Sequence, residues 1–266
     1  MNKPDHALGE FRQMDQLAAG DSPLHRLHPL VKLLTTVLYI VLVMSFGKYQ
    51  LSALCAMLLW PAGLFAVSGI SIGTCLYKLR VVLPLVCAVG ITNPFFDKAP
   101  MLYLGDVAIS GGVISMVTLM LKGLLCLTAS FLLIASTPMD SICAALRKLH
   151  LPAFGVTLLL LTYRYISTML QELSIMSEAY HLRAPLHKGI RPSAWGSFIG
   201  QLFLRSMDRA ENIYSAMQLR GFKGDFPYAD PGRLNFADWL YLPLAAAFLL
   251  FLRICDLPAL IGSAAF

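Results

Sequence analysis

The sequence predicts an all-α protein: a polytopic membrane helical bundle of about five spans, with six as the alternative, and a cytoplasmic domain of long amphipathic helices. Three observations support this class. Only 14% of the 266 residues are charged and 57% are apolar, whereas soluble domains are about 25% charged. Some stretches contain no charge at all, such as that between Lys48 and Lys78, and about 20 apolar helical residues cross a bilayer. Residues 137–234 hold eleven of the 21 basic residues.

The apolar stretches define the expected membrane spans. We expect a cytoplasmic N-terminal segment at residues 1–29, a membrane bundle at residues 30–136 and a C-terminal transmembrane segment at residues 236–266. The individual spans are expected at about residues 30–46, 51–69, 81–96, 111–136 and 236–252. Between the second and third spans, Lys78 and Arg80 indicate a surface turn over residues 74–80.

A few polar residues in or near the bundle are candidates for chemistry. Lys122 is the one charged residue of the fourth span, so it either has a function or, as we favour, extends to the interface or contacts a neighbouring helix. His25 and His28 are three residues apart, and we expect a hydrated pair at the membrane surface in preference to a metal site. The six cysteines contain no CxxC pair and are expected to be small apolar side chains.

The region of residues 137–235 is expected to face the cytoplasm, because its basic residues outnumber its acidic ones eleven to seven. Three helices are predicted in it, at about residues 138–150, 153–183 and 193–220. Thr137-Pro138 begins the first with a capping residue and a proline at the first helical position. The other two carry apolar stripes, through which we expect them to pack against each other.

Related sequences end the two longer helices. Ala179 precedes Arg183 by four residues, and 37 residues after that arginine Arg220 follows Ala216 in the same way, so each alanine shares a helical face with its arginine. Pro185 stops the first helix after Ala184, and Gly221 can cap the second in the left-handed conformation. We call Ala179–Ala184 the first tip and Ala216–Gly221 the second tip, and expect both to be exposed. An arginine there suits bidentate pairing with a partner carboxylate.

The sequence resembles a known family, the transmembrane T component of energy-coupling factor (ECF) transporters. Within this family it is most similar to the cobalt/nickel branch, CbiQ or NikQ. The resemblance covers nearly the whole chain. It is carried by the two tips and by the segments Ser22-Pro23-Leu24-His25-Arg26-Leu27-His28-Pro29-Leu30-Val31-Lys32, Thr137-Pro138, Tyr163-Arg164-Tyr165, Leu204-Arg205-Ser206 and Asp208-Arg209-Ala210-Glu211. Two positions depart from the family pattern: Ala184 replaces a glycine, and His28 replaces an aspartate.

The resemblance implies a coupling subunit of an ABC importer in the bacterial inner membrane. The two tips would dock on a pair of cytoplasmic ATPase subunits (CbiO/NikO-like), which bind ATP and Mg. The membrane part would hold a substrate-binding S component (CbiM/NikM-like), with a small accessory membrane subunit as an optional further partner. The implied role is cobalt or nickel uptake, and the alternative is a vitamin-type transporter, which shares the second tip.

Other classes of function are disfavoured. The chain has no GxxxxGK[ST] or HExxH motif, so we expect no cofactor in it and no catalysis by it. An intramembrane enzyme would need acid, base or nucleophile residues converging near Lys122 or Tyr163, and the predicted spans offer Lys122 no such partner. A passive scaffold or channel leaves the paired tips unexplained. Basic and aromatic residues form no shared stripe, which disfavours nucleic acid as a partner.

Overall fold

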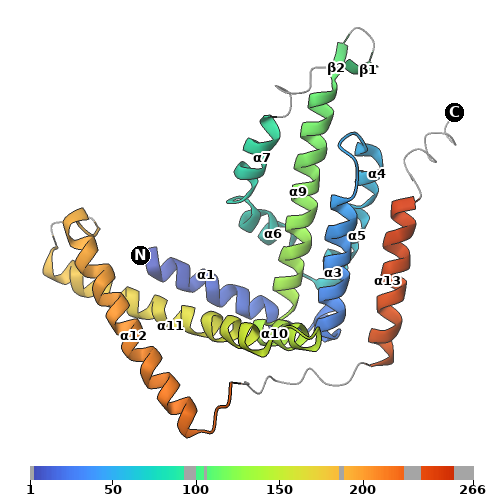
Figure 1. Cartoon of the computed structure of the whole chain (residues 1–266). Coiled ribbons are helices and arrows are strands. Elements are labelled where there is room, and N and C mark those ends of the chain that lie inside the picture. The colour runs from blue at the N-terminus through green and yellow to red at the C-terminus, as the bar shows by residue number, and fades with distance from the viewer. Residues whose placement is uncertain (1–2, 93–99, 105–106, 186–188, 225–234, 255–266) are drawn as a thin grey trace. The chain divides into compact units, whose positions relative to one another are not determined.

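The computed structural model describes residues 3–92, 100–104, 107–185, 189–224 and 235–254, and helices dominate it (Figure 1). It divides into two compact units. The bundle unit comprises Leu17–Pro138 and Pro231–Phe266, and the long-helix unit comprises Met1–Gln16 and Met139–Asp230. The N-terminal segment, predicted as one piece, is therefore shared between the units.

The bundle unit is built around one long helix, α9 (Gly111–Ser136), which packs against five other described helices (Figure 1). These neighbours are α3 (Pro29–Met44), α4 (Leu51–Ala56), α5 (Leu59–Ser68), α6 (Ile72–Leu79) and α7 (Leu83–Ile91). The other described helices of the unit are α2 (Pro23–Arg26) and α13 (Phe236–Ile254), of which α13 lies against α3.

The core of the bundle lies where α3, α4, α9 and α13 meet. Its largest fully buried side chains include Tyr39, Met57, Leu125 and Leu249. The hydroxyl of Tyr39 donates a hydrogen bond to the backbone carbonyl of Met57 at 3.0 Å, which satisfies the one polar atom that this side chain brings into the apolar core. Burial of these side chains accounts for the packing of sequence-distant helices.

Within the described residues, four helical stretches are long and apolar enough to cross a membrane: Leu51–Ser68 (which joins α4 and α5), Gly111–Ser136, Ala153–Arg183 and Phe236–Ile254. Helices α6 and α7 together make a fifth if their 60° bend is one broken span. The described part of the chain thus confirms the all-α, polytopic class. The set of spans differs from the expected one, because α3 has only 16 residues, whereas α11 (Ala153–Arg183) qualifies.

The predicted surface turn at residues 74–80 is wrong, because α6 occupies Ile72–Leu79. The side chain of Ser71 accepts a hydrogen bond from the backbone N–H of Thr74 at 3.2 Å and caps this helix. Cys75 and Leu79 bury its apolar face. The lysine and arginine that indicated a turn lie at the end of the helix, where basic residues are favourable.

A short antiparallel hairpin was not predicted. Strand β1 (Pro100–Leu104) pairs with β2 (Val107–Ser110), which leads directly into α9. The end of the expected third span, residues 93–96, lies outside the described residues, as do residues 255–266.

The long-helix unit contains α1 (Lys3–Ala18, apart from its last two residues), α10 (Met139–Lys148), α11, a short 3₁₀ turn at Pro192–Ala194 and α12 (Trp195–Leu219). Helices α10, α11 and α12 agree with the predicted ranges, whereas α1 was not predicted. Cys143, Val156 and Leu160 are buried together and join α10 to α11. Aromatic contact between Phe11 and Tyr163, 4.8 Å between ring centroids, joins α1 to α11.

The predicted packing of α11 and α12 through their apolar stripes is largely wrong. Phe198 is the only buried residue of α12, and four side chains on one face of this helix are about half exposed: Ile199, Phe203, Met207 and Tyr214. We call them the open face of α12. The structure gives this face no covering helix among the described residues, because α11 contacts α12 over only a short length.

Candidate functional site

The first tip ends α11. The last helical residue is Arg183, and the backbone N–H of Ala184 donates to the carbonyl oxygen of Tyr180 at 3.0 Å. Ala184 takes an extended φ of −134°, so this end lacks a left-handed cap. Pro185 has no N–H and stops the helix there, as predicted. The side chains of Ala179 and Arg183 are exposed.

The second tip ends α12 in a different way. Gly221 has a φ of +82°, its N–H donates to the carbonyl of Gln218, and the N–H of Phe222 reaches back to the carbonyl of Met217. This pair of bonds is the Schellman motif, in which a left-handed glycine satisfies the last helical carbonyls. The predicted left-handed conformation of Gly221 is therefore confirmed. Ala216, Arg220 and Gly221 are all exposed.

Each tip also presents a leucine that the sequence reasoning missed. Leu182 is 84% exposed and Leu219 is 90% exposed, and each directly precedes the arginine of its tip. The shared pattern is Ala-x-x-Leu-Arg, present at Ala179 and again at Ala216, so a comparison of the two copies could have found it. An apolar side chain beside a guanidinium gives each tip one group for an apolar pocket and one for a carboxylate.

A hollow of about 630 Å³ lies next to the second tip, between α11 and α12. Ala216 lines it together with charged residues of both helices, among them Asp208 and Arg209. An ion pair between Arg205 and Glu172 joins the two helices at this hollow. The ion pair bridges α11 and α12 where their apolar contact is small.

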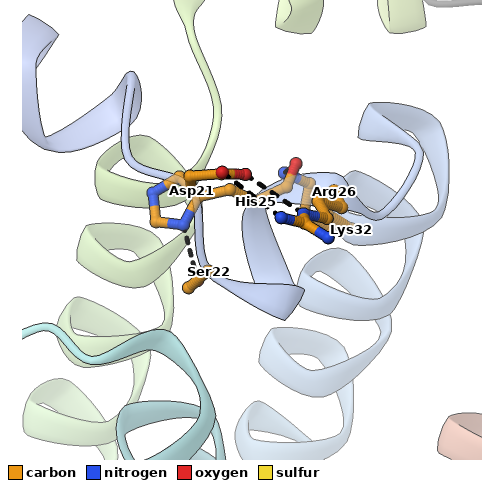
Figure 2. A network of polar contacts seen from close by, with 5 residues as sticks. All are labelled: Asp21, Ser22, His25, Arg26 and Lys32. Atoms are coloured by element: carbon orange, nitrogen blue, oxygen red, sulfur yellow. Dashed lines mark hydrogen bonds and ion pairs between the residues drawn. The ribbon is translucent and has the colours of Figure 1, made fainter.

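A polar cluster occupies one end of the bundle unit, around His25 (Figure 2). Its Nδ1 atom lies 2.6 Å from the hydroxyl of Ser22. Its Nε2 atom lies 3.0 Å from the carbonyl oxygen of Leu17 and 3.3 Å from that of Ala135. In the same view, the guanidinium of Arg26 forms an exposed pair with both oxygens of Asp21, and this arginine lowers the pKa of the Asp21 carboxyl.

The expectation of a hydrated histidine pair is wrong. His28 is only 4% exposed, and its Nδ1 atom accepts the backbone N–H of Leu30 at 3.2 Å, so it caps α3. Capping is a role that an aspartate also performs, which accounts for the replacement at this position. The backbone N–H of His28 donates to Asp238 at the start of α13 at 2.8 Å.

Two lysines of the bundle unit donate to backbone carbonyls. Lys32 is 4% exposed, and its Nζ atom lies 2.7 Å from the carbonyl oxygen of Ser136 and 3.4 Å from that of His25. Lys122 donates to the carbonyl of Phe46, just after the end of α3. Lys122 therefore contacts a neighbouring chain segment, which is one of the two expected possibilities. Among the described residues, no group of three His, Cys, Asp or Glu side chains could hold a metal ion.

Comparisons with known proteins identify one matching family and several similar proteins. The sequence matches the family described as CbiQ, cobalt transport protein, over residues 20–228. It is 30% identical over 118 residues to the nickel permease LarQ of Lactiplantibacillus plantarum, which covers 44% of this chain and 43% of the relative. It is 28% identical over 227 residues to the energy-coupling factor transporter transmembrane protein EcfT of Limosilactobacillus fermentum, covering 77% of this chain and 82% of the relative. The EcfT protein of Bacillus subtilis is 24% identical over 222 residues.

Proposed function

Because the chain belongs to the CbiQ family of cobalt transport proteins, which are T components of ECF transporters, we propose that it is the transmembrane coupling subunit of an ECF-type ABC importer. The family match over residues 20–228 carries this proposal, because it includes both tips and most of the bundle. T components work with ATPase subunits and a substrate-binding S component. In the proposal, ATP and Mg are bound by the ATPases, and this chain performs no catalysis.

The partners on the ATPase side are two CbiO/NikO-like subunits, one at each tip. The two exposed Leu-Arg pairs support this assignment, because each offers an apolar side chain and a bidentate cation at the end of a long helix. α11 is about 46 Å long at 1.5 Å per residue, and the Arg205–Glu172 ion pair joins it to α12. Closure of the ATPase pair would therefore move the two helices as rigid bodies.

The S component, CbiM/NikM-like in this proposal, is held by the membrane part, and the open face of α12 is an additional contact for it. An exposed row of Ile199, Phe203, Met207 and Tyr214 favours an apolar partner over water. A small accessory membrane subunit is a further candidate partner. The bundle lies in a bacterial inner membrane, and the excess of basic residues supports a cytoplasmic location for the long-helix unit.

The proposed cargo is cobalt or nickel. The description of the family as cobalt transport proteins and the similarity to a nickel permease support it. A vitamin-type T component is the second candidate, because EcfT proteins align over about four fifths of their own length. Uptake of radioactive Co²⁺, Ni²⁺ and vitamins by cells that express the complete transporter distinguishes the two.

The experiment that tests the coupling role is co-purification in mild detergent. The wild-type chain is expected to retain two ATPase subunits, and R220E is expected to lose them while inserting normally, because a carboxylate would then face the partner's carboxylate. R12E is the matched control, since Arg12 is an exposed arginine of the same unit that lies on α1 and belongs to neither tip. Equal ATPase retention by R220E and R12E would contradict the proposal.

A further inference from the structure

The chain passes from one unit to the other three times, and two of these passages, at Gln16–Leu17 and Pro138–Met139, lie among the described residues. On the bundle side, both passages are held by the same small cluster. His25 contacts the carbonyls of Leu17 and Ala135, and Lys32 donates to the carbonyl of Ser136. We call these two side chains and three carbonyls the exit joint. Two segments that are more than 100 residues apart in sequence are thereby fixed to each other.

The hydrogen-bond pattern indicates the state of His25. Nε2 lies near two carbonyl oxygens, which can only accept, so this nitrogen carries the proton. Nδ1 can then accept from the hydroxyl of Ser22 at 2.6 Å. One ring therefore links the end of α1, the end of α9 and the residue that precedes α2.

Lys32 adds a charged donor to the same place. Its ammonium is buried and donates to two backbone carbonyls: that of Ser136, the last residue of α9, and that of His25. A charged donor binds the end of a helix well, because the last carbonyls of α9 have no partner inside the helix. Thus Lys32 holds the end of α9 immediately before Thr137 and Pro138 lead into α10.

Within the long-helix unit, both passages lead to α11. The first continues from α1, where the hydroxyl of Tyr163 donates to Asp15 at 2.5 Å and Phe11 packs on the same ring. The second continues through α10, whose Cys143 is buried against Val156 and Leu160. α11 is therefore connected to the exit joint through two chain segments.

We propose that His25 and Lys32 are positioning residues for energy coupling: by tying these two passages together, the exit joint makes displacement of α11 act on the bundle through both passages at once. Neither residue touches nucleotide or cargo. This inference rests on the proposed function, because it concerns how that function transmits motion. It predicts loss of coupling without loss of assembly when the joint is broken.

The test uses the complete transporter in proteoliposomes, with uptake and ATP hydrolysis measured on the same sample. H25A and K32M are expected to retain the ATPases and to keep hydrolysing ATP, whereas uptake per ATP falls about tenfold, within the usual range of coupling between sites. K32R should restore most of the ratio, because arginine still donates to Ser136. K122M is the matched control: it removes a lysine-to-carbonyl bond of the same unit that involves no residue of the exit joint, and should leave the ratio unchanged.

The outcomes separate this inference from the proposed function. Unchanged uptake per ATP in H25A and K32M overturns the exit joint, as does an equal fall in K122M or no recovery in K32R. A variant that fails to assemble is replaced by S22A, which removes only the partner of Nδ1 and should lower the ratio less than H25A; an unchanged ratio in S22A then counts against the inference. If wild-type chain fails to retain ATPases, the proposed function itself is wrong.

Discussion

The Nζ atom of Lys32 lies 2.7 Å from the carbonyl oxygen of Ser136, 104 residues further along the chain. This bond joins the beginning of α3 to the end of α9 and is buried. The cluster of Figure 2 also contains the exposed pair of Arg26 and Asp21. The buried bond of Lys32 should contribute more to the stability of the fold than the exposed Arg26–Asp21 pair, because solvent screens exposed pairs.

We therefore expect K32M to lower the free energy of unfolding by about 2 kcal/mol, because it leaves a buried carbonyl without its donor. R26Q should cause no measurable change in thermal stability. Thermal unfolding of the detergent-solubilised protein measures both. Equal melting temperatures of K32M and wild type would show that the buried bond contributes nothing.

Asp238 is expected to be the most sensitive acidic residue of the bundle. One of its oxygens accepts the N–H of His28, and the other accepts the N–H of Asn235 at 2.9 Å. D238A removes both acceptors and should cost about 3 kcal/mol, whereas D238N keeps one and should cost about half as much. E211A, at an exposed residue of α12, is the control and should melt with the wild type. The expected melting temperatures rise from D238A through D238N to the wild type.

Gly221 and Gly200 provide a matched pair on α12. An added methyl group meets nothing within 4 Å at either position, so only backbone conformation differs. Gly221 has a φ of +82°, and G221A should destabilise by about 1 to 2 kcal/mol. Gly200 is inside the helix, and G200A should stabilise by about 0.5 to 1 kcal/mol. Opposite shifts in melting temperature are expected, and G221A should also weaken ATPase retention, because the Arg220 backbone loses its cap.

Leu182 and Leu219 are expected to contribute to ATPase binding without contributing to the fold, because both are almost fully exposed. Burying a leucine on a partner contributes about 1.5 to 3 kcal/mol, so L219Q should weaken ATPase binding about tenfold or more at unchanged melting temperature. The control is I199Q on the open face of α12, which should retain the ATPases and weaken the S component instead. Quantitative pull-down of both partners measures the difference, and loss of the same partner from both variants would refute it.

Regular helices with strong local signals were predictable from the sequence. α11 ends at Arg183 because Pro185 follows, and α12 ends before Gly221 because that glycine takes a positive φ. The charge-free stretch after Lys122 likewise marks α9. In each case the deciding interaction lies within a few residues of the helix end, so one sequence is enough to find it.

Features that depend on distant partners were not predictable in this way. The cap that His28 gives to α3 is local, but its burial depends on Asp238, 210 residues away. The contact of His25 with Ala135 spans 110 residues. Nothing in the stripe of α12 shows that Ile199 and Phe203 stay exposed, since an apolar stripe looks the same whether its partner belongs to this chain or to another. The two exposed leucines were not predicted, although the pattern Ala-x-x-Leu-Arg is present at both tips.

The most direct test of the central claim is photo-crosslinking from the tips in the assembled complex. A photoreactive phenylalanine is placed at position 182 or 219, with position 199 as the comparison. We predict that positions 182 and 219 crosslink to ATPase subunits and that position 199 crosslinks to the S component. Crosslinks from positions 182 and 219 to lipid alone, or to a protein on the outer side of the membrane, would contradict the account.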